Sequence, residues 1–455
     1  MPIQSKNPAT EEVLKSFEEL SEDALEQKIS DASKAFLAWK EVSFAERAKL
    51  MHAHAKYLRD NADEWATLAS VEMGKTKTAA LGEVEKCAFT CDYYADNAER
   101  ILTNQKFNAG AKENYISFEP LGIVLAVMPW NFPYWQVYRF AAPALMAGNV
   151  GLLKHASNVP QCAEAIEKAF TQSGFPKGAF QNLFISSSRV EKIIRDKRVM
   201  AVTLTGSEKA GRSVASIAAD EVKKTVLELG GSDPFIVLAD ADINAAAENA
   251  ILGRMQNNAG QSCISAKRFI VESSIADKFT EALVGNIKKL VVGDQILPET
   301  NVGPLATEQG LLEVDRQVKE SVQKGAKILF GGHRIGIKGY FYEPTILSNV
   351  VKGMPVYDEE VFGPVAPIIV VANEQEAIRV ANDTPFGLGA TIFTKDIEKA
   401  KKLATKIEAG NVFVNGFVRS DPRAPFGGVK RSGYGRELSD YGIKEFVNIK
   451  NVWVA

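Results

Sequence analysis

The chain has 455 residues, with 54 Lys and Arg against 56 Asp and Glu, and a formal net charge of -2. Because positive and negative residues are nearly equal in number, the chain has no general electrostatic attraction for nucleic acid or an anionic membrane. The 24 Phe, 11 Tyr and 5 Trp residues require a folded core, which excludes disorder as the dominant state. At roughly 100–200 residues per domain, the length predicts two or three domains.

The N-terminal segment 1–20 has no apolar run of the kind found in a signal peptide, and no stretch reaches the roughly 18 apolar residues of a membrane span. Four cysteines in so long a chain do not make a disulfide framework, so we expect a reducing, cytoplasmic location. The four histidines do not cluster, and no metal site is expected.

The first hundred residues are predicted to be helical and to cover a sheet that comes later in the chain. Ser21 can cap a first helix, and Ser43 with Glu46 forms a capping box before a second. Asn61 with Glu64 is a weaker version of the same signal before a third helix.

From about residue 115, short β-branched runs alternate with helical stretches. Strands are predicted at 123–128, 150–154, 180–185, 200–204, 225–229 and 235–238, and helices near 159–173, 188–196 and 207–219. Such alternation predicts a parallel, doubly wound sheet. A second alternating series after residue 242 predicts a second α/β domain. The strand-like tail, 444–454, has no obvious local partner and is expected to pair with another subunit.

Four clusters of residues suited to catalysis or ligand binding lie at predicted strand ends or loops, where doubly wound sheets bind ligands. The first is Pro-Trp-Asn-Phe-Pro at 129–133. The two prolines hold Asn131 rigidly, and a rigid amide is a good donor to a developing oxyanion. The alternative is a proline-rich turn in which Asn131 bonds its own backbone.

The second cluster, Thr-Gly-Ser at 205–207 with Gly211, joins a strand to a helix and suits a pyrophosphate at the helix start. Gly206 could equally serve a tight turn. The third, Leu-Glu-Leu-Gly-Gly at 227–231, places Glu228 in apolar company, which raises a carboxyl pKa and suits a general base. A strand-end Glu that faces solvent or pairs with Lys is the alternative.

The fourth cluster is Gly-Gln-Ser-Cys at 260–263, in a loop after a predicted helix. Small neighbours leave the Cys263 sulfur accessible, and a thiolate is a strong nucleophile. A free cysteine is otherwise commonly inert and buried.

Taken in order, these clusters resemble the aldehyde dehydrogenase superfamily over almost the whole chain. The resemblance also includes Gly-Asn at 148–149 leading to Lys154, Glu-Glu-Val-Phe-Gly-Pro at 359–364, Asn415, Pro-Phe-Gly-Gly at 425–428, Ser-Gly at 432–433 and Gly-Arg-Glu at 435–437. It implies an α/β fold of two doubly wound parallel-sheet domains plus a small β oligomerisation domain. The implied parts are a dinucleotide-binding domain (1–100 and 120–230), a catalytic domain (231–431) and an oligomerisation domain (101–119 and 432–455) that builds a homodimer or homotetramer.

The resemblance also implies a mechanism. Cys263 attacks the aldehyde to give a thiohemiacetal, Asn131 stabilises the oxyanion, and hydride passes to the nicotinamide. Glu228 then activates the water that hydrolyses the thioester, so water is the expected acceptor. The cofactor residues implied are Pro129, Trp130, Lys154, Ser157, Gly206, Ser207, Leu229, Glu360 and Phe362.

Position 157 departs from a pattern common in NAD-preferring relatives, where a Glu three residues after the lysine binds the ribose 2′-hydroxyl. Ser157 removes repulsion against a 2′-phosphate, while Lys154 attracts one. We therefore expect NADP to be accepted, with NAD also usable. The alternative is that Ser157 merely caps the following helix.

The substrate is expected to contact Trp135, Arg139 and Ser420. An Arg at position 139 resembles succinate semialdehyde dehydrogenases and would pair with a distal carboxylate. A second Arg that some of these enzymes carry is replaced by Asn257, and Ser265 replaces a cysteine that some use as a redox switch. Alternatively, Arg139 reaches an acidic neighbour or a subunit contact.

Several functions are compatible with these residues. Oxidation of succinate semialdehyde with NAD(P) leads, and a broad-specificity aldehyde dehydrogenase is the nearest alternative. A cysteine esterase or thioesterase without redox chemistry could use the same thiol and base. A catalytically silent binding protein would more readily have lost Cys263 or Glu228, and an acyl phosphate reductase would not need Glu228.

Overall fold

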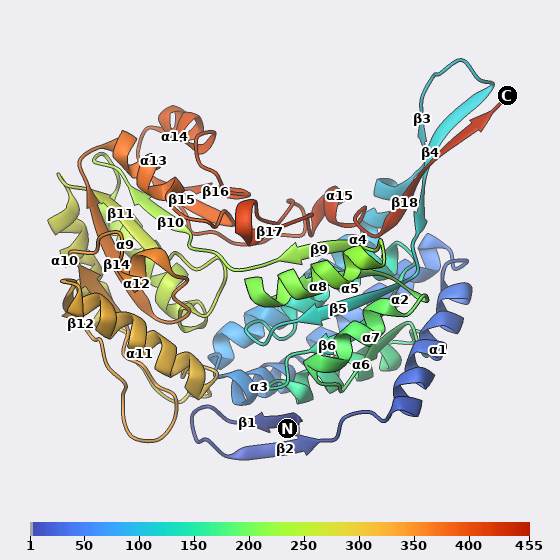
Figure 1. Ribbon diagram of the computed structural model, residues 1–455, viewed down its shortest axis with the longest axis horizontal. Coiled ribbons are helices and arrows are strands. Elements are labelled where there is room, and N and C mark those ends of the chain that lie inside the picture. Colours follow the sequence, from blue (N-terminus) through green and yellow to red (C-terminus); the bar gives the residue numbers. More distant parts are fainter. Residues whose placement is uncertain (1–2) are drawn as a thin grey trace.

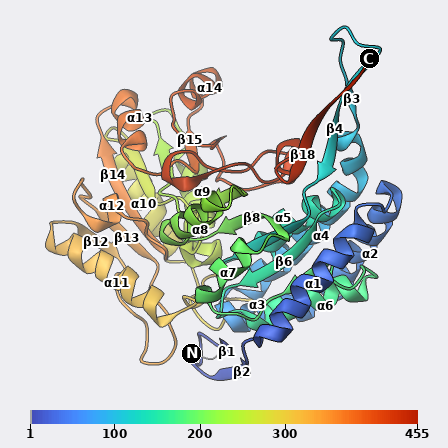
Figure 2. The same cartoon turned by 45° about the vertical axis from the view of Figure 1, so that its right-hand side comes forward.

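The computed structural model describes residues 3–455 as two α/β lobes joined side by side, with a narrow β extension leaving one of them (Figures 1 and 2). Each lobe has its own hydrophobic core. The first core draws mostly on residues between 25 and 229, and the second on residues between 235 and 407. The predicted fold class is confirmed, since both main sheets are parallel except for one edge strand in each.

The first lobe contains a six-stranded sheet in the order β17-β9-β8-β5-β6-β7. Its strands are β5 (Ile123–Met128), β6 (Val150–His155), β7 (Phe180–Asn182), β8 (Val199–Thr205), β9 (Lys224–Glu228) and β17 (Gly433–Tyr434). Strand order runs outward from β5 to β7 and then reverses to β8 and β9. The reversal creates a switch point between the carboxyl ends of β5 and β8, where such sheets bind ligands.

Eight α-helices surround this sheet. They are α1 (Glu22–Trp39), α2 (Phe44–Asp60), α3 (Ala62–Met73), α4 (Lys77–Leu102), α5 (Trp135–Met146), α6 (Pro160–Gln172), α7 (Val190–Arg195) and α8 (Glu208–Asp220). Helix α1 packs on β5, β6 and β7, which confirms that an early helix covers a later sheet. The long helix α4 packs against α2, α3 and α5 and reaches the boundary between the lobes.

The capping signals have mixed outcomes. Ser21 accepts a hydrogen bond from the Ala24 N–H, and the Ser43–Glu46 capping box forms in both directions. Each such cap contributes about 1 kcal/mol to helix stability. The prediction for Asn61 is wrong in detail, because Asn61 begins α3 without a side-chain cap and donates instead to the Tyr57 carbonyl.

The second lobe contains a seven-stranded sheet in the order β12-β13-β14-β11-β10-β15-β16, parallel except for β12. The strands are β10 (Pro234–Val237), β11 (Arg268–Glu272), β12 (Lys327–Phe330), β13 (Thr345–Ser348), β14 (Val365–Val371), β15 (Gly389–Phe393) and β16 (Asn411–Val414). The helices are α9 (Ile243–Ile251), α10 (Ala276–Ile287), α11 (Glu308–Gln323), α12 (Pro355–Asp358), α13 (Glu374–Asn382) and α14 (Ile397–Ala404). A π-helical turn (Leu252–Gln256) and a 3-10 turn (Asn258–Gly260) lead into the Cys263 loop.

The β extension is a three-stranded sheet in the order β18-β4-β3. Its strands are β3 (Gln105–Lys106), β4 (Glu113–Pro120) and β18 (Val447–Val454). The tail strand therefore has a partner within its own chain, because β18 pairs antiparallel with β4 over all eight residues. No partner lies near the tail in the sequence, as expected, since β4 precedes β18 by more than 300 residues. β18 remains at an edge of the sheet and projects away from the lobes (Figure 1), so its pairing with another subunit stays a prediction.

Two further details differ from the sequence prediction. Residues 433–434, expected in the third part of the chain, pair with β9 of the first sheet through β17. The N-terminal hairpin of β1 (Ile3–Lys6) and β2 (Val13–Phe17) was not predicted. Most of β2 is exposed, so its sequence carries no clear apolar alternation. Within residues 3–455, no helix is long and apolar enough to cross a membrane.

Candidate active site

Cys263 lies at the junction of two cavities between the lobes. It lines a cavity of about 230 Å³ at the switch point of the first sheet, and also a second cavity of about 560 Å³ toward α4 and α5. Its thiol is free and only half-buried. Burial raises the pKa of the Cys263 thiol to about 12, while Arg139 and Lys267 act to lower it. The nucleophile is therefore protonated in the free protein at neutral pH and needs activation.

Strained backbone precedes this nucleophile. Asn258, Ala259 and Gly260 all adopt positive φ, at 60°, 51° and 73°. A Cβ at Gly260 would stand 2.2 Å from the Gly363 carbonyl oxygen, so only glycine fits there. Non-glycine residues in this conformation persist only where the surroundings hold them, and they are commonly found at functional sites.

Lys267 stabilises the loop that carries Cys263 through hydrogen bonds to its backbone. This buried lysine donates through Nζ to the carbonyls of Ser262 (2.9 Å), Cys263 (2.7 Å) and Ser265 (3.2 Å). It also lies 3.5 Å from the Glu360 carboxylate. Sequence reasoning missed Lys267, because nothing in the sequence indicates that its ammonium turns back onto the preceding loop.

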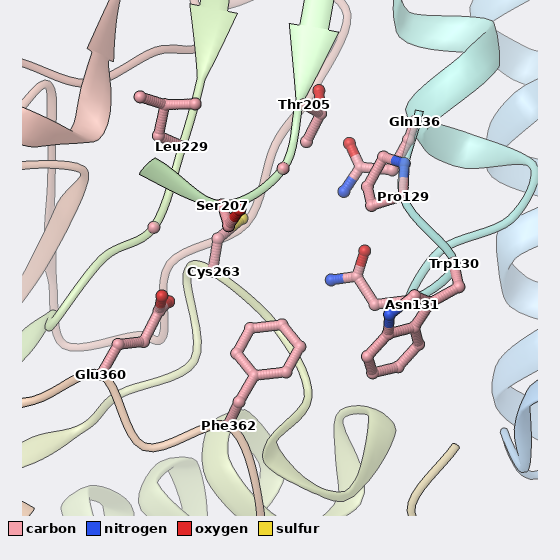
Figure 3. Close-up of a pocket in the computed structure, with 12 residues that line it drawn as sticks. Pro129, Trp130, Asn131, Gln136, Thr205, Ser207, Leu229, Cys263, Glu360 and Phe362 are labelled. Carbon is pink, nitrogen blue, oxygen red and sulfur yellow. The ribbon is translucent and has the colours of Figure 1, made fainter. Parts of the chain in front are cut away.

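Asn131 is tied to the same loop. Its Nδ2 donates to the Gln261 carbonyl (3.0 Å), while Asn258 Nδ2 donates to the Asn131 carbonyl (2.7 Å). The amide side chain points into the space shared with Cys263 and Phe362 (Figure 3). One N–H of a primary amide remains when the other is engaged, so Asn131 keeps a donor for an oxygen bound beside Cys263.

The first cavity brings together most of the predicted cofactor residues. Its walls include Pro129, Trp130, Asn131, Gly206, Ser207, Leu229, Cys263, Glu360 and Phe362 (Figure 3). Glu360 accepts a hydrogen bond from the Gly231 N–H (2.9 Å), and the rings of Trp130 and Phe362 meet edge to face with centroids 5.8 Å apart. Thr205, from the second predicted cluster, also lines it, as does Gln136, which was not predicted.

These walls suit a dinucleotide. Ser207 caps α8, and the N–H groups of Glu208 and Lys209 in the first turn have no acceptor within residues 3–455. Gly206 leaves the approach to this helix end open, since its nearest side-chain neighbour would be 3.6 Å from an added Cβ. Unsatisfied N–H groups and the positive end of a 13-residue helix favour a pyrophosphate.

Lys154 and Ser157 lie outside this cavity, at the end of β6 and in the loop that follows. Burial lowers the pKa of Lys154, and Glu19 acts to raise it. Lys154 makes no ion pair within the described residues. Ser157 is exposed and does not cap α6, whose N-cap is Val159. The capping alternative for Ser157 is therefore wrong.

Glu228 ends β9 but lines neither cavity. Its buried carboxyl group lies near Glu437, and neither oxygen accepts a hydrogen bond from the described residues. Burial, with a smaller contribution from Glu437, raises the pKa of Glu228 well above its usual range, while Arg139 and Arg436 oppose the shift. These surroundings disfavour the charged form of the carboxyl group, and its role as a base stays a prediction.

The three predicted substrate residues meet in the second cavity, which contains Trp135, Arg139 and Ser420 together with Cys263. The Arg139 guanidinium, however, already has a carboxylate partner. Its Nε lies 2.6 Å from Glu437 Oε2, and the group stacks 4.7 Å from the centre of the Phe426 ring. Arg139 thus reaches an acidic neighbour, as in the second interpretation above, and its contact with a substrate stays a prediction.

Positions 257 and 265 are explained differently by the structure. Asn257 lines the second cavity where some relatives have Arg. The buried Ser265 hydroxyl donates to the Gly253 carbonyl (2.9 Å) and accepts from Arg254 (3.3 Å), so it braces the turn before the nucleophile. Among residues 3–455, no group of three or more His, Cys, Asp or Glu side chains is placed to hold a metal ion.

A doubly wound sheet with a phosphate-type helix end, facing a thiol in a second α/β lobe, defines a class of nucleotide-dependent enzymes that use a cysteine nucleophile. Comparison with known proteins supports this class. The profile of the aldehyde dehydrogenase family matches residues 1–452. The chain is 53% identical over 458 residues to "Succinate-semialdehyde dehydrogenase [NADP(+)] 1" of Mycobacterium tuberculosis, covering all of both chains.

Two further relatives support this. "Probable succinate-semialdehyde dehydrogenase [NADP(+)]" of Synechocystis is 51% identical over the full length of both chains. A crystal structure of succinic semialdehyde dehydrogenase from Streptococcus pyogenes with NADP+ superposes with a TM-score of 0.97 at 42% identity, covering 99% of each chain. The chain belongs to the aldehyde dehydrogenase family. It is an NAD(P)-dependent oxidoreductase that acts on aldehydes.

Proposed function

We propose that the protein oxidises succinate semialdehyde to succinate and prefers NADP as its cofactor. The observation that carries the proposal is the position of Cys263 in the wall of two cavities. One cavity collects the residues expected to bind the dinucleotide, and the other collects those expected to bind the substrate. An aldehyde bound in the second cavity would therefore meet the thiol from the side opposite the nicotinamide site.

The chemistry follows from the residues around the sulfur. The thiolate of Cys263 attacks the carbonyl carbon, and the oxyanion is met by Asn131 Nδ2 and the backbone N–H of Cys263. When bound, NAD(P) supplies the hydride acceptor. Glu228 serves as the base for thioester hydrolysis after its side chain turns toward the sulfur, and its raised pKa suits a group that must take a proton near neutral pH.

The dinucleotide would be held along the edge of the first sheet. Lys154 would bind the adenosine ribose and Ser157 the adjacent 2′-phosphate, while Gly206 and Ser207 meet the pyrophosphate. Pro129, Trp130 and Leu229 would line the channel, with Glu360 and Phe362 orienting the nicotinamide half. NADP is favoured because the exposed Ser157 brings no negative charge beside Lys154, and relatives at 51–53% identity are named for NADP.

The chain is also proposed to form a homodimer or homotetramer through the β extension. The outer edge of β18 is unpaired within residues 3–455, and an eight-residue free edge is a template for adding a strand. We retain the division into dinucleotide-binding (1–100, 120–230), catalytic (231–431) and oligomerisation (101–119, 432–455) parts as a proposal, with 433–434 moved to the first. The four free thiols favour a cytoplasmic location.

The test is a set of initial rates for succinate semialdehyde and uncharged butanal, each with NADP and NAD. We expect kcat/KM to favour the semialdehyde by at least about tenfold and NADP over NAD. Equal rates for both aldehydes would replace this proposal with the broad-specificity alternative. Turnover of a thioester or ester without any nucleotide would point to the esterase alternative.

A further inference from the structure

The second cavity contains a lysine with no carboxylate partner. Lys86 lies on α4 and lines the cavity together with Cys263. Its Nζ donates to the Ser420 hydroxyl (2.9 Å) and lies 4.1 Å from the centre of the Trp135 ring. None of the ion pairs within residues 3–455 involves Lys86.

The acidic side chains near this lysine form ion pairs with other basic residues. Glu83 pairs with the buried Lys75, and Asp421 lies 2.7 Å from Arg423. Glu437 is held by Arg139, as described above. These three pairs leave no carboxylate for Lys86. The cavity therefore keeps the charge of Lys86 and that of Arg419, an exposed arginine that also lines it and makes no ion pair within residues 3–455. An unpaired cation in a partly buried site is costly unless an anion enters to pair with it.

Ser420 adds a second donor beside Lys86. Its buried hydroxyl accepts hydrogen bonds from Lys86 Nζ and from Trp135 Nε1 (3.0 Å). Two donors occupy both lone pairs of the oxygen, so the hydroxyl proton must point to a third group. Within residues 3–455 it donates to no acceptor. An ammonium and a hydroxyl thus converge on the same part of the cavity, which is the donor set for a carboxylate.

Burial, and after it the charge of Arg139, lowers the pKa of Lys86 to about 8. The ammonium form is therefore destabilised but still predominates at neutral pH. A carboxylate bound against it would relieve this destabilisation.

We propose that Lys86 and Ser420 form the subsite that binds the distal carboxylate of the aldehyde substrate. The inference rests on the proposed function, since it assigns that carboxylate to particular residues. It also changes the expectation for Arg139. Because its guanidinium is already paired with Glu437, Arg139 acts as a positioning residue in the cavity wall. Lys86, which is more buried than the exposed Arg419, provides the charge that distinguishes an anionic aldehyde from a neutral one.

The test compares kcat/KM for succinate semialdehyde and butanal in wild type, Lys86→Met, Lys86→Arg and Arg139→Ala. Methionine keeps the length of the lysine stem but removes its charge. We expect Lys86→Met to lower kcat/KM for the semialdehyde at least tenfold, in line with a charge-assisted hydrogen bond. Butanal should change less than about threefold, which also reports correct folding. Lys86→Arg should recover most of the preference.

Lys49→Met is the matched control, because Lys49 is an exposed lysine on α2 with no ion pair in the described chain. It should leave both substrates unchanged. Inhibition by succinate gives a readout independent of turnover, and its Ki should rise at least tenfold in Lys86→Met. A loss of less than threefold, or an equal loss for both aldehydes, would overturn the subsite.

The outcomes separate this inference from the function on which it rests. If wild type shows no preference for the semialdehyde, the proposed function fails and the subsite with it. If wild type prefers the semialdehyde and Lys86→Met keeps that preference while Arg139→Ala loses it, the function stands and the carboxylate belongs to Arg139.

Discussion

The two cavities that meet at Cys263 are built in different ways. The cofactor cavity is made mainly of contiguous motifs at the ends of β5, β8 and β9. Backbone N–H groups and glycines provide much of its binding surface. The substrate cavity is assembled from side chains of α4, α5 and the loop near residue 420, and several of its charges are already paired. The fold therefore fixes the first cavity, while individual side chains set the properties of the second.

The largest expected effect comes from the residue that both cavities share. Cys263→Ser should lower kcat at least about a thousandfold, because a hydroxyl is a far weaker nucleophile than a thiolate. Nucleotide affinity should stay within about threefold of wild type, since the cofactor cavity depends on other groups. Steady-state rates and the quenching of tryptophan fluorescence on titration with NADP measure the two effects.

Cys91→Ala is a suitable control for this variant. Cys91 is a buried thiol on α4 and lines neither cavity. Its loss should leave turnover unchanged within about twofold, at the cost of a small cavity in the core. Substantial dehydrogenase activity in Cys263→Ser would contradict the assignment of the nucleophile and the comparison built on it.

A change on the cofactor side alone should leave the substrate side untouched. Ser157→Glu places a carboxylate three residues after Lys154, where it can bind a ribose 2′-hydroxyl but repels a 2′-phosphate. We expect the NADP-to-NAD ratio of kcat/KM to fall at least about tenfold, with the preference between semialdehyde and butanal unchanged.

Ser157→Gln separates charge from size in this experiment. Glutamine has the shape of glutamate without its charge, so the cofactor ratio should move much less. If both variants shift the ratio equally, steric exclusion rather than repulsion explains the cofactor preference. If neither shifts it, Ser157 does not contact the 2′ position.

The difference between the cavities also explains what sequence could predict. Nine of the predicted residues line the cofactor cavity. Gly206, Ser207 and Leu229 lie in motifs at strand ends that a doubly wound sheet brings together, whereas Glu360 and Phe362 were implied by the family resemblance alone. Lys86 and Ser420 lie 334 positions apart, and nothing local in either segment indicates their contact. Lys267 was missed for a similar reason, since its partners are backbone carbonyls.

The fold shows the same pattern. Buried β-branched runs such as 123–128 and 150–155 were predicted almost to the residue. The hairpin of β1 and β2 was missed, because its short strands pair with each other and expose most of β2. The tail strand β18 was predicted, but its pairing with β4 across more than 300 residues leaves no local signal. Only the family resemblance placed 101–119 and 432–455 in the same part of the molecule.

The smallest effect tests the substrate side through pH. Because the pKa of Lys86 is about 8 in the free protein, its protonated fraction falls from about nine tenths at pH 7 to about one tenth at pH 9. A lysine binds a carboxylate only in its protonated form, so carboxylate binding is lost as pH rises through this pKa. The ratio of kcat/KM for succinate semialdehyde to that for butanal should therefore fall about tenfold over this range.

Taking the ratio isolates Lys86 from the other titrating groups. Ionisation of Cys263 affects both aldehydes equally and cancels. Among the charged groups that face Lys86, Glu83 is paired with Lys75, Asp421 with Arg423, and Arg139 with Glu437. The exposed Arg419 also lines the cavity, and it is the same in wild type and Lys86→Met. Cys87, next to Lys86 in the chain, is buried with its thiol pKa raised well above its usual value, so it stays neutral. In Lys86→Met the ratio should be low and independent of pH. A fall of the same size in that variant would assign the titration to another group, and the charge of the second cavity would then not depend on Lys86.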